Sequence, residues 1–248
     1  MRILKHTLAI TSIVFVSMFF IATASARRVQ VKQQQAEAPD FENFPIVDFE
    51  AKEPVEPKVK AARDARARKY SKKYAGAINE ELNQIFTNTD WDLRLPALPV
   101  ARSAAIFIGT VVDAQAHLTP DKSGVFSEFA FQVESILKSD SKRTVAAGET
   151  VSVERNGGRV RMPSGKIVVS WTNQQNMPKV GARYVFFLTH DFVTAGDTGD
   201  DFYLLTGYEF KNEKVNPLDS PFNKEVLAYK GATESSFLED LFNALKSP

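Results

Sequence analysis

The stretch that decides the fold is Ala104–Ile136, which reads AAIFIGTVVDAQAHLTPDKSGVFSEFAFQVESI. Ala104–Val112 is apolar nearly throughout, which indicates a strand that is covered on both faces. In Phe129–Glu134 apolar and polar side chains alternate, which is typical of a strand with one buried and one solvated face. The loop Gln115–Gly124 is rich in turn-forming residues. The stretch therefore predicts two paired strands, with Gly109 marking a bulge or a bend where a barrel turns a corner.

Further strands are predicted after this pair, each set off by a turn signal such as Asn156-Gly157-Gly158. They are Val151–Glu154, Ile167–Trp171, Tyr184–Leu188, Phe202–Leu205 and a short Glu213–Val215. In the second of them, Ile167, Val169 and Trp171 are expected to face inward. Short strands at regular spacing favour an all-β fold. We expect a mainly β protein, an OB-fold-like five- to seven-stranded antiparallel barrel with an N-terminal and a C-terminal helix.

Two helices are expected outside the barrel. Within Lys58–Phe86, Tyr70, Tyr74, Ile78, Leu82 and Ile85 follow one helical stripe. Near the C-terminus, Ser236 and Glu239 have capping-box spacing before an apolar stripe, so this helix is expected to pack on the barrel. The predicted organisation is a signal peptide at 1–26, a disordered linker at 27–56, an amphipathic helix with a basic start at 57–87, an OB-like barrel at 88–219 and a C-terminal helix at 220–248.

Between residues 58 and 73 the chain is strongly basic. Asp64 is the one acidic residue in this run. The basic residues are Lys58, Lys60, Arg63, Arg66, Arg68, Lys69, Lys72 and Lys73. Such a run is either a solvated helical face or a weak contact with an anionic surface, a membrane leaflet or an envelope polymer.

The N-terminus has the pattern of a secretory signal peptide. Arg2 and Lys5 give a basic start, Leu8–Ala22 is an almost unbroken apolar run, and Ala24-Ser25-Ala26 supplies small residues at a cleavage site. We expect cleavage after Ala26 and no transmembrane span thereafter, the alternative being an uncleaved membrane anchor. The predicted location is periplasmic or secreted, in a bacterium.

Composition narrows the class of protein. The chain of 248 residues has no cysteine, so an exported form holds together through its core and not through disulfides. Lys and Arg number 31 against 30 Asp and Glu, so no charge field predicts a polyionic partner such as a specific nucleic acid. In residues 27–56, isolated Phe41, Phe44 and Phe49 stand among polar residues and prolines. This segment is read as disordered, or as docked along the barrel through its aromatic rings.

The succession of strands carries a family resemblance. Residues 105–112, 129–138, 148–153 and 181–188 read AIFIGTVV, FAFQVESILK, GETVSV and GARYVFFL. This series resembles OB-fold domains of the netrin and metalloproteinase-inhibitor kind, above all cysteine-free versions in exported bacterial proteins. The resemblance implies the barrel. The inhibitors bind the protease zinc through an N-terminal cysteine, which this chain lacks, so it does not imply that mechanism.

No catalytic motif, metal site or cofactor site is predicted. His117 and His190 fall in predicted loops without a carboxylate at a recognisable spacing, and such histidines are usually solvated. Residues 197–201, Asp-Thr-Gly-Asp-Asp, are read as a solvated hairpin tip or, less simply, as calcium ligands.

One cluster is a candidate ligand site. Arg155, Arg159, Arg161 and Lys166 surround the Asn156-Gly157-Gly158 turn. They form either a basic finger for an anionic ligand or a solubilising hairpin. The leading hypothesis is an exported, non-enzymatic binding module of the cell envelope whose partner is a protein or an envelope polymer. The alternatives are a protease inhibitor, by analogy of fold, and a carboxylate-dependent hydrolase, which needs two acidic side chains that converge in one pocket.

Overall fold

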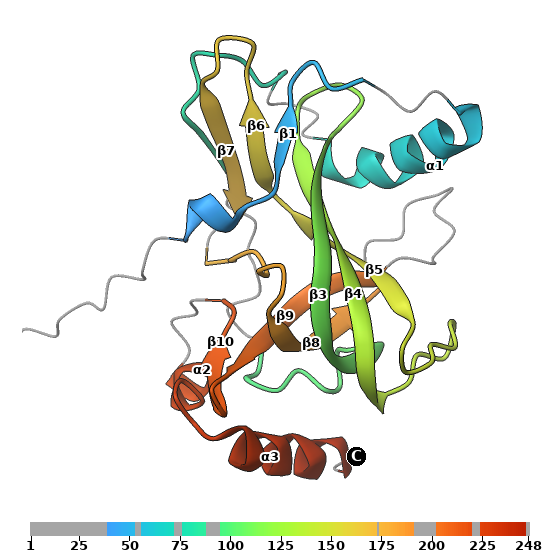
Figure 1. Cartoon of the computed structure of the whole chain (residues 1–248), viewed down its shortest axis with the longest axis vertical. Helices are drawn as coiled ribbons and strands as arrows, with labels where there is room; N and C mark the ends of the chain where they lie inside the picture. Colours follow the sequence, from blue (N-terminus) through green and yellow to red (C-terminus); the bar gives the residue numbers. More distant parts are fainter. Residues whose placement is uncertain are drawn as a thin grey trace, which may run out of the picture. The chain divides into compact units, whose positions relative to one another are not determined.

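The two longest strands of the computed structural model, β3 (Ala105–Leu118) and β4 (Val125–Lys138), pair antiparallel (Figure 1). Their register shifts between Ile108 and Gly109, which confirms the predicted irregularity at this glycine. A Cβ atom on Gly109 would lie 2.1 Å from the carbonyl oxygen of Gln132, so only glycine fits where the two backbones approach.

The structure describes residues 39–52, 56–71, 76–87, 95–172, 174–190, 202–219 and 224–246. They belong to one compact unit, Ala36–Pro248. The expected signal peptide at 1–26 and the Asp-rich segment 197–201 lie outside the described residues. Within the described ranges, no helix is long and apolar enough to cross a membrane.

Five strands close into a barrel. Besides β3 and β4 these are β5 (Thr150–Asn156), β8 (Arg183–Thr189) and β9 (Phe202–Lys211). The hydrogen-bonded order is β3-β4-β5-β9-β8, and β8 pairs with β3 to complete the ring. The short β10 (Lys214–Pro217) continues the sheet from β9. The predicted barrel is confirmed, but it is not wholly antiparallel, because β5 and β9 run parallel.

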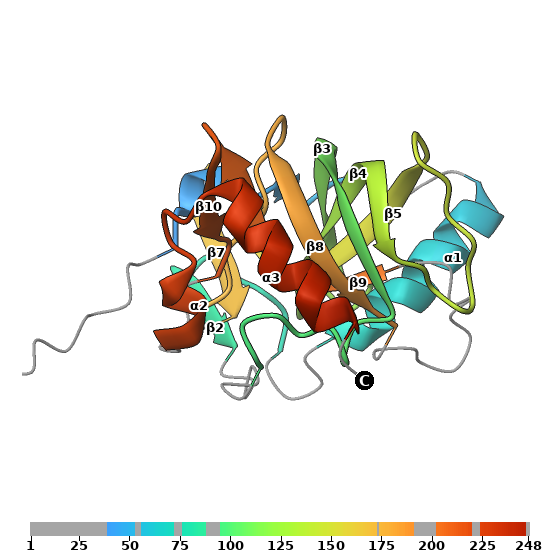
Figure 2. The ribbon, with the colours of Figure 1, turned by 90° about the horizontal axis from the view of Figure 1, so that it is seen from below.

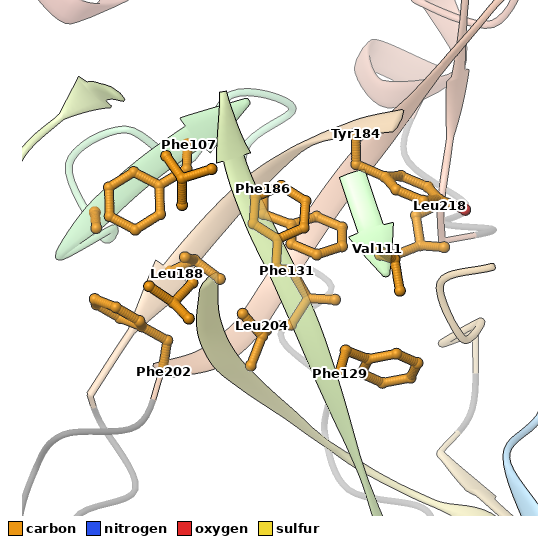
Figure 3. Packing of buried hydrophobic residues seen from close by; sticks show 14 of the residues in the cluster. Phe107, Val111, Phe129, Phe131, Tyr184, Phe186, Leu188, Phe202, Leu204 and Leu218 are labelled. Atoms are coloured by element: carbon orange, nitrogen blue, oxygen red, sulfur yellow. The ribbon is translucent and has the colours of Figure 1, made fainter. Parts of the chain in front are cut away.

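Aromatic side chains fill the barrel. The rings of Phe131 and Phe186 stack with centroids 4.4 Å apart, and Phe107 meets Phe202 edge to face (Figure 3). Phe131 and Phe186 have no solvent exposure. Phe44, in the segment expected to be a linker, is also buried in this core. Scattered aromatic residues thus dock although their sequence surroundings are polar.

A second, four-stranded sheet lies beside the barrel. Its order is β1 (Ile46–Asp48), β6 (Gly158–Arg161), β7 (Ile167–Thr172) and β2 (Gln84–Thr87). The predicted fourth barrel strand is therefore β7 of this sheet. Of the three residues expected to face inward, Val169 and Trp171 pack against the barrel core, but Ile167 is exposed. The opposite face, with Val168, Ser170 and Thr172, is the more deeply buried one. Both faces of β7 thus contribute packing residues, so alternation alone did not identify the more buried face.

The N-terminal helix is much shorter than the predicted 57–87. The α-helix α1 (Pro57–Ala67) continues into the 3-10 turn η2 (Arg68–Tyr70), and β2 occupies residues 84–87. Gly76 has a φ of +68°, which a right-handed helix does not accommodate. Ile78 and Leu82, expected on the helical stripe, pack instead in a small core beneath the second sheet. Their spacing fitted a helix, but pairing of β2 with β7 determines the structure.

The C-terminal segment forms α2 (Lys224–Ala228) and α3 (Glu234–Lys246). Figure 2 shows α3 crossing the barrel beside β8 and β9. Phe237 and Leu241 of α3 are fully buried, and Phe237 contacts the rings of Tyr208 and Phe210. This helix covers one side of the barrel and leaves the face around β4 and β5 to other elements.

Candidate functional site

Arg155, predicted as a surface ligand-binding residue, is buried. Its Nη2 atom donates to Oδ2 of Asp219 at 2.7 Å, and its Nη1 atom donates to the carbonyl oxygen of Asn176. Thr206 also donates to Asp219, at 2.9 Å. The prediction was wrong for Arg155 because β5 extends through Asn156, which leaves Arg155 inside the strand. It is the centre of a structural ion pair.

The other three predicted residues bind neighbouring elements. Arg159 Nε donates to the carbonyl oxygen of Phe44 at 2.8 Å, and Arg161 pairs with Asp48 at 3.0 Å, both near β1. Lys166 Nζ donates to the carbonyl oxygen of Glu80 at 2.5 Å. These contacts spread over two edges of the second sheet, so the structure does not bring the four basic residues into one pocket.

Both histidines have carboxylate partners, contrary to the expectation. His117 lies in β3, with Nε2 3.5 Å from Oε2 of Glu128. His190 Nε2 lies 2.8 Å from Oδ2 of Asp140, and both side chains are almost fully buried. Burial of Asp140 opposes its ionisation and by itself raises its pKa. The hydrogen bond with His190 and those from two backbone N–H groups together outweigh burial, so the pKa of Asp140 is lowered. In each pair the two residues are well separated in the sequence, so no short motif predicts that they come together in the fold.

Two carboxylates face each other on the barrel. Glu128 of β4 and Glu154 of β5 are directly opposite residues of the antiparallel ladder. Like charges at such positions repel and destabilise a sheet unless cations lie between them. Here Arg66 of α1 supplies one, with Nη2 3.6 Å from Glu128 and Nε 3.9 Å from Glu154. In Figures 1 and 2, α1 lies alongside the part of the barrel that these strands form.

Glu154 is the more deeply buried of the pair, with no solvent exposure. Lys69 Nζ lies 2.5 Å from its Oε2 atom, and Tyr70 Oη donates to the same atom at 2.8 Å. A buried carboxylate is tolerated only where cations and hydrogen-bond donors compensate for the lost water. The end of α1 and η2 provides both kinds of group at once.

Glu128 is held ionised. The pKa of its carboxyl group is lowered from 4.5 to about 2, first by the hydrogen bond with His117, against the effect of burial, and then by Arg66 and Ser152. Ser152 Oγ donates to Glu128 at 2.9 Å. Glu128 therefore carries its negative charge at neutral pH.

An aromatic contact completes the arrangement. The ring of Tyr70 stacks on the buried ring of Phe126 in β4, with centroids 4.6 Å apart and planes 10° from parallel. The backbone of Tyr70 also approaches the β3–β4 loop so closely that a Cβ atom on Gly124 would lie 2.3 Å from the Tyr70 carbonyl oxygen. Ser71 Oγ donates to Asp121 of the same loop at 3.2 Å.

These residues define the candidate site. We call Glu128, Glu154 and Phe126 with Gly124 the acidic face, and Arg66–Ser71 the docked segment. The basic run at 58–73 is therefore partly an internal contact, whereas Lys58 and Arg68 are exposed. Sequence reasoning missed the acidic face because Glu128 and Glu154 read as ordinary solvated strand positions.

The cationic groups that the acidic face contacts are those of Arg66 and Lys69 of the chain itself. Across the described ranges, no group of three or more His, Asp or Glu side chains is arranged to hold a metal ion. Comparisons of the chain with protein-family models, curated proteins and solved structures found no match.

Proposed function

We propose that the protein is an exported, non-enzymatic binding module of a bacterial cell envelope, built on an OB-type barrel. Numbered along the barrel alone, β3, β4, β5, β8 and β9 are strands one to five, and the ring runs 1-2-3-5-4 with strands three and five parallel. This order supports the OB-type assignment. The almost unbroken run of apolar residues at Leu8–Ala22 in the sequence supports export.

One observation carries the proposal. OB barrels bind ligands on the face of strands two and three and with the adjoining loops. In this chain that face is β4 and β5, and it bears the acidic face together with the β3–β4 loop. Glu154 and Phe126 have no solvent exposure, because Lys69 and Tyr70 cover them, so the two carboxylates and the ring already hold cationic and phenolic groups of the chain itself. The same groups suit a positively charged ligand where the docked segment makes way for it.

Binding fits this face better than hydrolysis. A hydrolase with two carboxylates requires one of them to carry a proton near neutral pH. Glu128 has a pKa of about 2, and Glu154 lies against Lys69 at 2.5 Å. Glu128 therefore does not supply a proton near neutral pH, and the cationic groups beside both carboxylates support cation binding.

A second surface supports contact with an anionic envelope polymer. Arg159 and Arg161 lie on the same face of the second sheet as Ile167 and Trp171, as the register of β6 and β7 requires. Trp171 stands edge to face with Phe41 at 5.5 Å. Arginine beside an aromatic ring on a sheet face suits an acidic polysaccharide. The variant Arg159→Ala/Arg161→Ala is expected to keep wild-type stability and to be no longer retained on a column of such a polymer. Unchanged retention of the variant would exclude this surface as the polymer-binding site.

The proposal is tested by immobilising the purified chain and passing over it an extract of a bacterial envelope at low salt. We expect a component that is retained, that elutes as ionic strength rises because exposed charges are screened, and that is lost with Glu128→Gln. N-terminal sequencing of the protein recovered from an exporting host is expected to begin at Arg27. A chain that retains nothing at low salt and keeps its first 26 residues contradicts the proposal.

A further inference from the structure

We propose that the acidic face recognises a cationic, tyrosine-containing polypeptide segment of a partner protein, and that the docked segment Arg66–Ser71 occupies this site in cis. The proposal rests on the assignment of the protein as a binding module and names the class of ligand. The docked segment then serves as the template for the partner and as a competitor against it.

Charge defines the first requirement of the site. Glu154 has no solvent exposure, and its carboxylate contacts an ammonium group at 2.5 Å and a phenol at 2.8 Å. When the docked segment leaves, this anion faces the space that Lys69 and Tyr70 filled. A ligand with a cation and a phenol at the same positions restores both contacts, whereas an anionic ligand repels the carboxylate and a purely apolar ligand restores neither contact.

Spacing defines the second requirement. Arg66, Lys69 and Tyr70 follow one another at intervals of three and one, so a helical turn places them on one side. Between them Ala67 is 1% exposed and packs in the same contact. A partner segment of the form Arg-Ala-x-Lys-Tyr in a helical conformation matches Glu128, Glu154 and Phe126 in turn.

Shape defines the third requirement. The carbonyl oxygen of Tyr70 would lie 2.3 Å from a Cβ atom on Gly124, so the ligand backbone touches the loop. Thr119 donates to the carbonyl oxygen of Gly124 and accepts from its N–H group, which fixes the loop in place. The site therefore selects a polypeptide that brings its own backbone against this glycine.

The contact is separable from the barrel. All five barrel strands follow the docked segment in the sequence, and α1 and η2 lie outside both sheets. Displacement of the segment breaks side-chain contacts and leaves the ladder hydrogen bonds of β3, β4 and β5 intact. Since a tethered segment acts at an effective concentration in the millimolar range, a partner in trans competes only if it binds more tightly or if the cis contact is weakened.

The experiment uses a fluorescent peptide with the sequence of residues 56–71, EPKVKAARDARARKYS. Its binding is measured by anisotropy to the wild-type chain and to the variant Arg66→Ala/Lys69→Ala/Tyr70→Ala. We expect the variant to bind at least about tenfold more tightly, because it lacks the tethered competitor. Adding Gly124→Ala or Glu128→Gln to the variant is expected to weaken binding about tenfold, whereas Glu134→Gln, an acid on the same strand, leaves it unchanged.

Equal affinity of wild type and variant overturns the proposal, as does binding that Gly124→Ala and Glu128→Gln leave unchanged. Tyr70→Ala alone serves if the triple variant does not fold, and it is expected to give the same order of affinities. A wild-type chain that dimerises by exchanging Arg66–Ser71, without binding the peptide, also overturns the proposal of a foreign partner. An envelope component that is retained and that excess peptide does not displace contradicts this inference but leaves the binding module standing.

Discussion

The ammonium group of Lys69 lies 2.5 Å from the carboxylate of Glu154. Glu154 has no solvent exposure and lies in β5, directly opposite Glu128 of β4. The side chain of Lys69 is only 8% exposed, so little of this ion pair meets solvent. It joins a segment that precedes both sheets to the face of the barrel.

Loss of one partner of this pair is expected to be costly. Lys69→Met keeps most of the side-chain volume but leaves Glu154 without its nearest cation, which should lower the free energy of unfolding by about 3–5 kcal/mol. Urea denaturation measures it. As the matched control, Arg161→Met breaks the exposed pair with Asp48, whose side chains are 52% and 60% exposed, and should cost less than about 1 kcal/mol. Similar losses for both would mean that Lys69 and Glu154 are solvated.

Stability is expected to fall in acid through Glu128. Its folded pKa is about 2 against 4.5 for the free group, so its contribution is complete above about pH 4.5 and is lost as the pH falls through 2. That shift corresponds to about 3 kcal/mol at most. Glu128→Gln should therefore be less stable than wild type at pH 7 and should approach it near pH 2. Parallel stability curves across that range would show that the carboxyl group titrates normally.

Gly124→Ala is expected to push the docked segment away from the loop. The new methyl group meets the Tyr70 backbone, and such overpacking usually costs about 1–3 kcal/mol. In NMR spectra the ring resonances of Tyr70 and Phe126 should shift because their stacking is lost. Gly165→Ala, whose Cβ atom meets open space but whose φ is +86°, should lose stability without those shifts. Unchanged ring resonances in Gly124→Ala would place the docked segment elsewhere.

Substitutions in β4 test which of its faces points into the barrel core. Phe131→Ala removes a ring that has no exposure and stacks on Phe186, so it should lower the free energy of unfolding by about 3–5 kcal/mol. Glu134 lies three residues after Phe131 in β4, and its exposed carboxylate pairs with Arg183 of β8. Glu134→Ala breaks that pair and should lower the free energy of unfolding by less than about 1 kcal/mol. Thermal and urea unfolding compare the two, and equal effects would reverse the assigned facing of β4.

The sequence was sufficient to predict the barrel strands but not the second sheet. Alternation in β4 and the glycine at 109 are local signals, and both correspond to observed features. The strands β1 and β2 are three and four residues long and pair in parallel with a distant hairpin. Strands so short have no periodicity of their own, and parallel pairing over a long separation leaves no turn signal.

The candidate site was hidden for a related reason. Glu128 and Glu154 occupy positions that read as solvated, and Arg155 reads as the edge of a turn, yet Glu154 and Arg155 have no exposure. Each is compensated by a residue far along the chain, Lys69 for Glu154 and Asp219 for Arg155. Burial of a charge depends on such distant partners, so local polarity gave the wrong expectation.

Exchange of the docked segment for a peptide of the same sequence can be followed by NMR. In ¹⁵N-labelled Lys69→Ala chain, the cis contact is weakened, and the unlabelled peptide of residues 56–71 is titrated in. We expect the amide resonances of the chain's own Arg66–Ser71 to move toward unstructured values as the peptide saturates, while those of the barrel strands away from the acidic face stay in place. Resonances of Arg66–Ser71 that remain unchanged at saturating peptide would contradict an exchangeable segment on the acidic face.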